Sequence, residues 1–216
     1  MFNASYPDEL GLVQSLARRG GNVTGTSFRS PQVLEKLLQM LREIAPKAVR
    51  IALPWDGPGA RANGGGKISA EAYERAAARL GMKIQYFDAV RGDEVEGLIE
   101  RIAASPVDAL VLHGAAVFRP YFAQLIAAAN ARGIAVAGAV DTIAQRGGLL
   151  DYSPDDLNYY DRTASYVDRI LKGAIPADLP VEEPTKINLH VNLKTAKAIG
   201  LKVPQSILAR ADWVIE

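Results

Sequence analysis

Residues 83–112, KIQYFDAVRGDEVEGLIERIAASPVDALVL, contain the pattern of a strand, a helix and a second strand. Lys83–Phe87 and Ala109–Leu112 are short runs rich in apolar and aromatic residues, as expected for buried strands. Asp93 followed by Glu96 predicts a capping box at the start of the helix between them. The helix itself is indicated by four apolar residues at helical spacing: Val95, Leu98, Ile99 and Ile102. This order is typical of a βαβ unit in a parallel sheet.

The same alternation of strands and helices continues on both sides of this unit. Val49–Leu53 and Ile134–Ala137 are further apolar strands, and Ser30–Pro31 predicts the start of a long helix with Ser30 as its N-cap. That helix carries one apolar stripe: Val33, Leu37, Leu38, Leu41 and Ile44. We therefore predict an α/β fold with a complete, doubly wound parallel sheet in the middle of the chain.

The last third of the chain offers elements that are too few for a second complete core. Residues 147–152 are predicted as a short strand, and Ser153–Pro154 opens a predicted helix. The proline-rich segment 174–184 favours extended backbone, and residues 186–191 alternate as a strand before a short helix at 193–199. The buried face of the helix after Ser153 is expected to hold six residues: Leu157, Tyr160, Ala164, Val167, Ile170 and Leu171.

The composition is that of a folded chain of one or two domains without disulfides. The 216 residues are 49% hydrophobic and include no cysteine, which leaves the redox compartment undecided. With 25 Lys and Arg against 24 Asp and Glu, the chain has no one-signed charge to attract nucleic acid or an anionic membrane. No apolar run approaches the ~18 residues of a membrane span. Residues 1–7 lack the pattern of an export signal.

The segment WDGPGARANGGGK, residues 55–67, contains the spacing of a dinucleotide fingerprint from Gly57 to Ala62. A working fingerprint needs a helix that begins inside the motif, so that its amides meet the pyrophosphate. Proline and glycines here are expected to delay the next helix until about Ser69. A surface loop is the favoured interpretation, and a Rossmann-like enzyme that binds a nucleotide or phosphate at Gly57–Gly66 is the alternative.

Catalytic and metal-binding motifs are not apparent in the sequence. There is no cysteine nucleophile and no Gly-x-Ser-x-Gly elbow, and His113 and His190 lie in different strand regions. We therefore expect a binding protein that is not an enzyme and that has no cofactor and no metal.

Six residues at or near the ends of predicted strands are the candidate ligand contacts: Trp55, Asp56, His113, Asp141, Thr142 and Tyr152. Ligands of open α/β sheets bind beyond the carboxyl ends of the strands. Asp141 could accept a hydrogen bond from a ligand ammonium or hydroxyl, or cap the following turn. Trp55 could stack on an apolar ligand or cover the sheet edge, and His113 could donate to a ligand oxygen or to the backbone.

Five stretches of the sequence resemble the solute-binding proteins of a bacterial ABC-transporter family related to tryptophan and tyrosine import. They are Ser15–Gly25, Tyr166–Gly173, Pro176–Glu182, Asn192–Leu201 and Ala209–Asp212. The resemblance implies a type I periplasmic-binding-protein-like fold, in which two α/β lobes are joined by three strand crossings. Such proteins close on a small ligand and present the closed form to a membrane permease.

The resemblance also implies a domain layout. Residues 1–27 would be a remnant of the N-terminal lobe and 28–146 the complete C-terminal lobe. Residues 147–182 would return to the partial N-terminal lobe, and 183–216 would form the hinge crossing and the C-terminal lobe tail. Relatives carry a secretion signal and several βα units before the first motif, which this chain is expected to lack.

Two positions depart from the pattern of the family. Arg18–Gly21 stands where relatives usually have Arg-Pro-Gly-Gly, and Trp55–Pro58 replaces Asn-Pro-like residues. The second change lies at the candidate ligand contacts.

We predict that the chain is the solute-binding component of an ABC importer and binds an amino-acid-like or aromatic molecule by hinge closure. The expected partners are the ligand, a membrane permease and, through the incomplete lobe, a second copy of the chain. The resemblance implies a periplasmic location, whereas the chain as written would be cytoplasmic if it were the whole product. A cytoplasmic ligand-sensing domain is the other alternative.

Overall fold

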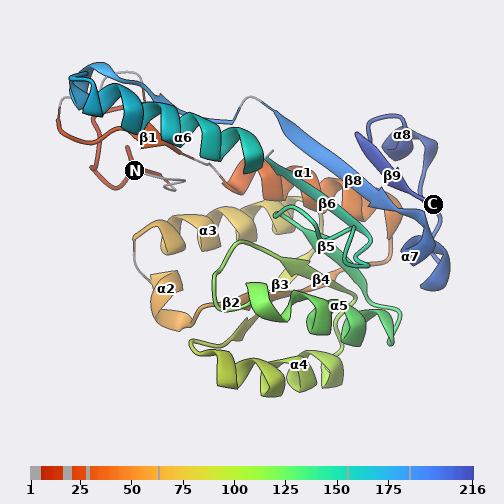
Figure 1. The fold of residues 1–216 in the computed structure, drawn as a ribbon. Coiled ribbons are helices and arrows are strands. Elements are labelled where there is room, and N and C mark those ends of the chain that lie inside the picture. The colour runs from red at the N-terminus through yellow and green to blue at the C-terminus, as the bar shows by residue number, and fades with distance from the viewer. Residues whose placement is uncertain (1–5, 17–20, 28–29, 63, 155, 185) are drawn as a thin grey trace. The chain divides into compact units, whose positions relative to one another are not determined.

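The computed structural model describes residues 6–16, 21–27, 30–62, 64–154, 156–184 and 186–216 (Figure 1). The chain divides into two compact units. The first comprises residues 1–30 and 154–187, and the second comprises 31–153 and 188–216. The backbone thus passes from one unit to the other three times.

The second unit is built on a seven-stranded sheet with the order β3-β2-β4-β5-β6-β8-β9. Strand β2 is parallel to both β3 and β4, and the pairs β4–β5, β5–β6 and β8–β9 are also parallel. The strands span Arg50–Trp55 (β2), Lys83–Asp88 (β3), Ala109–Leu112 (β4), Ala135–Gly138 (β5), Leu150–Pro154 (β6), Ile187–Asn192 (β8) and Trp213–Ile215 (β9). The predicted α/β class and its parallel sheet are confirmed.

Helices cover both faces of this sheet, with α1 and α3 on one face and α4 and α5 on the other (Figure 1). These four helices span Ser30–Ile44 (α1), Gly64–Arg79 (α3), Val95–Ala104 (α4) and Phe122–Asn130 (α5). Shorter helices span Pro58–Ala62 (α2), Leu193–Ala198 (α7) and Gln205–Leu208 (α8). Single 3-10 turns lie at Gly92–Glu94 (η1) and Arg119–Tyr121 (η2). The apolar stripe predicted for α1 is buried throughout. The predicted N-cap side chain of Ser30 lies outside the described residues.

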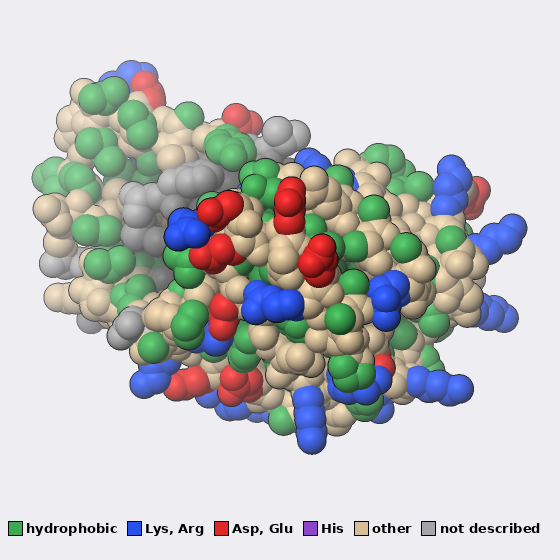
Figure 2. Space-filling model, turned by 90° about the horizontal axis from the view of Figure 1, so that it is seen from below, with side chains coloured by type: hydrophobic (Ala, Val, Ile, Leu, Met, Phe, Trp, Pro, Cys, Tyr) green, Lys and Arg blue, Asp and Glu red, His purple; other side chains and the backbone are tan. Residues whose placement is uncertain are grey.

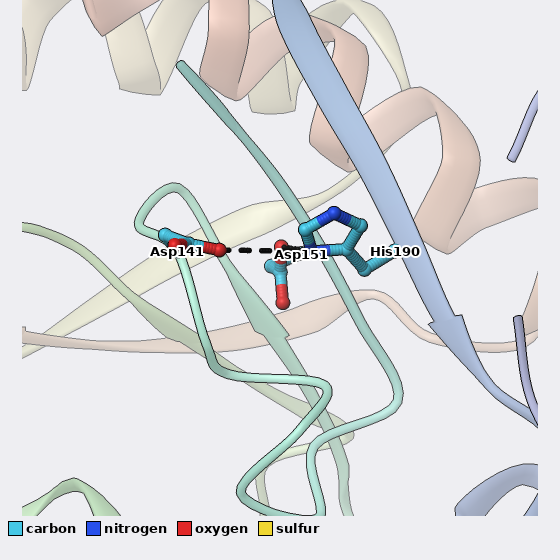
Figure 3. Close-up of side chains that lie close together, drawn as sticks. All are labelled: Asp141, Asp151 and His190. Atoms are coloured by element: carbon cyan, nitrogen blue, oxygen red, sulfur yellow. Dashed lines mark ion pairs between the residues drawn. The ribbon is translucent and has the colours of Figure 1, made fainter. Parts of the chain in front are cut away.

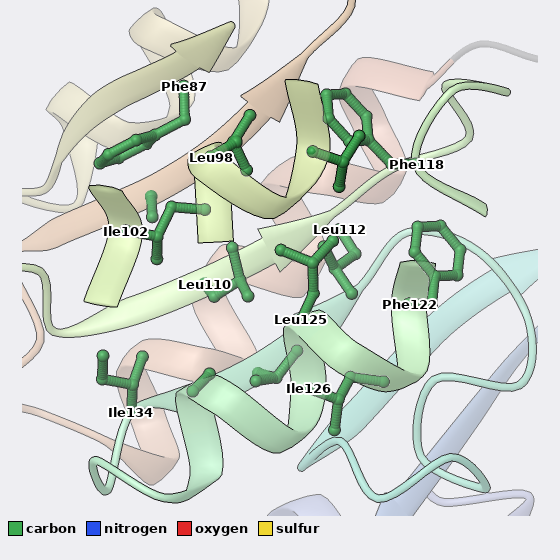
Figure 4. Close-up of a cluster of buried hydrophobic side chains, with 14 of the residues drawn as sticks. Phe87, Leu98, Ile102, Leu110, Leu112, Phe118, Phe122, Leu125, Ile126 and Ile134 are labelled. Atoms are coloured by element: carbon green, nitrogen blue, oxygen red, sulfur yellow. The ribbon is translucent and has the colours of Figure 1, made fainter. Parts of the chain in front are cut away.

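The main core of the second unit lies between the sheet and helices α4 and α5 (Figure 4). Leu98 of α4 and Leu125 of α5 pack there against Leu110 and Leu112 of β4. Val111, which alternates with these leucines along β4, is also buried. Because successive side chains of a strand point to opposite faces, β4 is covered on both sides, as expected in a doubly wound sheet.

The residues predicted to cap the start of α4 were wrong. The capping carboxylate belongs to Glu94 and not to the pair Asp93 and Glu96, because it accepts the Val90 and Arg91 N–H groups at 2.8 and 3.4 Å. Asp93 instead pairs with the Arg91 guanidinium.

The prediction of a loop up to about Ser69 was also wrong. The glycine-rich segment after β2 folds into α2 and the start of α3. The helices approach each other closely at Gly66, where an added Cβ would lie 1.8 Å from the Ala60 carbonyl oxygen. Glycine at position 66 therefore permits the packing of α2 against α3.

The first unit contains a two-stranded parallel sheet of β1, Gly25–Thr26, and β7, Val181–Glu182. It also contains α6, Asp156–Leu171, and the short turn η3, Pro176–Asp178. The Thr24 hydroxyl donates to the Leu179 carbonyl at 2.9 Å.

The face of α6 that was expected to be buried is largely exposed. Tyr160, Val167 and Leu171 are 61%, 52% and 82% exposed, whereas Tyr166 on the other side is buried and donates to the Pro180 carbonyl at 2.7 Å. Helical periodicity identifies residues that share a face but not the partner that covers them. Leu157, also assigned to that face, lies outside the residues whose side chains are described.

The division between units also differs slightly from the expected boundary after residue 146. The β6 residues Leu150 and Asp151 pair with Ala137 and Gly138 of β5, which keeps the chain in the second unit up to Ser153.

Acidic and basic side chains are interspersed on the face of the molecule seen in Figure 2, as the nearly neutral charge of the sequence predicts. Among the described residues, no helix combines the length and the apolar character needed to span a bilayer.

Candidate functional site

The candidate ligand contacts of the sequence lie at one edge of the seven-stranded sheet. Trp55 ends β2, His113 follows β4, and Asp141 follows β5. Asp151 in β6 pairs with Gly138, the last residue of β5, and therefore lies at the same edge. Trp55, His113 and Asp141 thus lie at the carboxyl ends of parallel strands, where ligands of such sheets bind.

An aromatic cluster surrounds Trp55. The indole ring lies 4.7 Å from the His113 ring, and it makes edge-on contacts with Tyr86 of β3 at 5.5 Å and Tyr73 of α3 at 5.9 Å between ring centroids. Trp55 is only 3% exposed, and its indole Nε1 has no hydrogen-bond partner within the described residues. The indole N–H of Trp55 is therefore available to donate a hydrogen bond. The two tyrosines were not predicted.

His113 is held in one tautomer by its neighbour. Its Nε2 lies 2.8 Å from the Pro54 carbonyl oxygen, and because a carbonyl can only accept, Nε2 must carry the hydrogen. Burial lowers the pKa of His113, and the Pro54 carbonyl and the exposed Asp56 carboxylate counteract this shift only in part. The ring is therefore neutral near pH 7, and Nδ1 is left as a hydrogen-bond acceptor.

An ion pair borders the aromatic cluster. Arg61 of α2 pairs with Asp88 at the end of β3, with its Nη2 2.9 Å from the carboxylate Oδ2. The Arg61 guanidinium carbon also lies 4.3 Å from the centroid of the Tyr86 ring, which is a cation–π contact. Burial raises the pKa of Tyr86, so its hydroxyl stays protonated. Arg61 was missed because α2 was expected to be a loop.

A second cluster joins Asp141 to two residues that were not predicted, Asp151 and His190 (Figure 3). The His190 Nδ1 lies 3.0 Å from Asp151 Oδ1 and 3.6 Å from Asp141 Oδ1. Asp151 is fully buried, and its Oδ2 accepts the Ala144 N–H at 2.8 Å. Burial raises the pKa of Asp151 to about 6, although the Ala144 N–H and His190 oppose the shift.

The loop after β5 holds Asp141 in place. The Thr142 backbone, with φ of 73°, turns its N–H toward Asp141 Oδ1 at 2.8 Å. Thr142 Oγ1 accepts from Arg146 Nε at 3.1 Å. Asn192 donates to the Ala144 carbonyl at 2.8 Å and thereby ties the same loop to the end of β8.

The structure thus brings Trp55 and His113 together and places Asp141 in a different cluster. Asp56 is exposed after β2, and Tyr152 is half-buried in β6. Tyr152 points to the opposite face of the sheet from Asp151, because neighbouring strand residues alternate. Asp151 and His190 had no local signal, since only the folded chain makes β6 and β8 neighbours.

Comparison with protein families gives one match that spans nearly the whole chain. Residues 4–215 match the model of a family described as ABC transporter substrate binding protein. A search of the curated proteins found no match.

Several solved structures have a similar fold. An ABC domain from Streptococcus pneumoniae in complex with L-Trp is 23% identical, with a TM-score of 0.86, and the match covers 100% of this chain and 70% of that one. A conserved domain protein from Vibrio cholerae is 28% identical, with a TM-score of 0.83 and coverages of 96% and 68%. A ligand-free, open substrate binding protein with adhesive properties from Clostridium difficile is 23% identical, with a TM-score of 0.69 and coverages of 99% and 70%. These matches and the sheet order confirm the α/β fold of the type I periplasmic binding proteins.

Proposed function

Because this chain belongs to the ABC transporter substrate binding protein family, we propose that it is the solute-binding component of an ABC importer. The match over residues 4–215 is the observation that carries this proposal. Its partners are then a small molecule and a membrane permease, and its place of action is the periplasm. In this role the chain binds its ligand and releases it unchanged.

The proposed ligand is an amino-acid-like or aromatic molecule. The complex of the Streptococcus pneumoniae protein with L-Trp makes L-tryptophan the first compound to test. Three groups of the second unit are suited to such a ligand. The Trp55 Nε1–H and the His113 Nδ1 offer a donor and an acceptor, and Asp141, which is 35% exposed, can accept from an ammonium group. Asp56, Thr142 and Tyr152 remain candidates on position alone.

Binding is proposed to proceed by closure about the three chain crossings between the units, at residues 30–31, 153–154 and 187–188. A ligand that contacts both units would stabilise only the closed arrangement, so its binding energy would shift the population toward that state. The permease would then distinguish loaded from empty protein by this difference.

The exposed apolar face of α6 supports a further part of the proposal, self-association of the chain. Tyr160, Val167 and Leu171 are large, apolar and more than half exposed. Apolar surface of this kind tends to become buried between molecules. Analytical ultracentrifugation should show a concentration-dependent dimer, and a monomer at all concentrations would contradict this part.

Thermal unfolding with added ligands tests the proposed function. L-Tryptophan or L-tyrosine at about 100 times its dissociation constant would stabilise the fold by about 2.7 kcal/mol, which for a chain of this size raises Tm by roughly 5–10 °C. NAD and ATP should leave Tm unchanged. A shift with a nucleotide and none with any amino acid would instead favour the Rossmann-like enzyme.

A pair of tryptophan variants locates the site. Trp55→Phe keeps an aromatic ring but removes the indole N–H, and we expect affinity to fall about tenfold through the loss of one hydrogen bond. Trp213→Phe is the matched control, because Trp213 is half exposed on β9. Equal affinities in both variants would remove Trp55 from the proposed site.

A further inference from the structure

Asp141, Asp151 and His190 each direct one potential metal-ligand atom to a common point (Figure 3). The three atoms lie within 4.8 Å of one another. Around a tetrahedral ion with bonds of about 2.0–2.1 Å, neighbouring ligand atoms are about 3.3 Å apart. The 3.0 and 3.6 Å distances from His190 Nδ1 to the two carboxylates lie on either side of this value. His190 therefore lies at ligand spacing from both carboxylates, and the two carboxylates lie within 4.8 Å of each other, so small side-chain shifts bring all three onto one ion.

Two of the three atoms are buried without a hydrogen-bond partner within the described residues. They are Asp151 Oδ1 and His190 Nδ1, and although they are near each other their geometry is not that of a hydrogen bond. Asp151 is fully buried, and buried polar atoms are seldom left unpaired. An ion between these atoms would give both of them a partner.

We propose that Asp141, Asp151 and His190 bind a divalent transition-metal ion of the Zn²⁺ type. Two carboxylates neutralise the charge of such an ion, and an imidazole ligand favours zinc and its neighbours over Mg²⁺ or Ca²⁺. Asp141 is the most exposed of the three residues, so a water molecule or a solute would complete the coordination on its side.

The surroundings of the cluster hold the ligands in the required orientation. The Ala144 N–H fixes Asp151 Oδ2 at 2.8 Å and so leaves Oδ1 for the ion. Asn192 in turn fixes the Ala144 carbonyl, and the Trp213 ring packs edge-on against His190 at 5.7 Å between centroids. Such outer contacts are typical of metal sites, where they orient the ligands.

Titration with the metal alone tests the inference and does not depend on the proposed function. The full chain, freed of metal with a chelator and carrying no histidine tag, is titrated with ZnCl2 by isothermal calorimetry. We expect one ion per chain with a dissociation constant in the micromolar range or below. Bound Co²⁺ should give the visible absorption bands of a four- or five-coordinate ion.

Variants assign the binding to these residues. Asp151→Asn keeps an oxygen that can accept from the Ala144 N–H. Asp151→Asn and His190→Gln should each weaken Zn²⁺ binding at least 100-fold. Asp141→Asn, at a partly exposed position that tolerates change, should do the same even if the buried variants fail to fold. The control is Asp168→Asn, which changes an exposed carboxylate of α6 and should bind Zn²⁺ as the wild type does.

Three results would overturn the inference. The first is the absence of saturable Zn²⁺ binding to the wild-type chain. The second is binding that Asp141→Asn leaves unchanged. The third is binding that Asp168→Asn weakens as much as Asp141→Asn does, because the loss would then not be specific to these three residues.

Discussion

The Asp108 carboxylate binds the start of strand β2. Its replacement by asparagine tests how much one ion pair contributes to the free energy of unfolding. Its Oδ2 accepts the backbone N–H groups of Val49 and Arg50 at 3.0 and 2.8 Å, and its Oδ1 accepts from Arg50 Nη2 at 2.7 Å. The hydrogen bond from the Arg50 side chain is the main reason that the pKa of Asp108 falls to about 2. Asp108→Asn removes the charge and keeps an oxygen that can accept from the backbone.

The size of the effect follows from this pKa. A fall from the usual 3.8 to about 2 corresponds to at most roughly 2.5 kcal/mol, at about 1.4 kcal/mol for each unit. The Arg50 side chain is 49% exposed, so solvent screens the pair and we expect about 1 kcal/mol. Because the folded-state pKa is depressed, this contribution is present above about pH 4 and is lost as the pH falls from about 4 toward 2.

Urea unfolding at two pH values measures the effect. At about pH 7 the Asp108→Asn variant should be less stable than the wild type by about 1 kcal/mol, and at about pH 3 the difference should shrink. Asp93→Asn is the control, because Asp93 also pairs with an arginine but both side chains are 69% exposed, and no change in stability is expected. A difference for Asp108→Asn that persists undiminished at low pH would refute the electrostatic explanation.

Four further substitutions test the packing within each unit. Gly66→Ala should lower Tm, because its methyl group would collide with the Ala60 carbonyl. Gly97→Ala, at an open and exposed position in the first turn of α4, should add about 0.5–1 kcal/mol, and equal effects of the two substitutions in thermal unfolding would disprove the close contact. Leu98→Ala should cost about 2–5 kcal/mol in urea unfolding, and a loss below 1 kcal/mol would mean that this core is loosely packed. Tyr166→Phe removes one hydroxyl hydrogen bond in the first unit and should cost about 1 kcal/mol, so an unchanged unfolding midpoint would show that this bond adds nothing.

The parallel sheet could be predicted from the sequence because each strand carries a local signal. Runs such as Ala109–Leu112 are apolar at every position, which indicates burial on both faces, and the observed strand has the same bounds. The exposed face of α6 could not be predicted, because residues such as Leu171 show only that an apolar stripe exists. The early start of α3 was missed because glycines at 64–66 indicate a loop, whereas Gly66 in fact permits two helices to touch.

The candidate site was predictable only where position along a strand determines it. Trp55 ends β2 and His113 follows the neighbouring strand β4, and the two rings meet at the sheet edge as that rule implies. Asp151 and His190 meet because β6 and β8 are adjacent in the sheet, although the chain passes through the other unit between them. No spacing of residues in the sequence shows this adjacency.

Calorimetric titration of the wild-type chain with L-tryptophan, followed by recovery of the compound, tests most directly whether this molecule holds a solute. A solute-binding protein should bind one L-tryptophan, or another aromatic amino acid in the same series, saturably and should return it completely in unaltered form. Chemical conversion of the compound, or heat released by NAD or ATP and by none of the amino acids, would contradict this prediction.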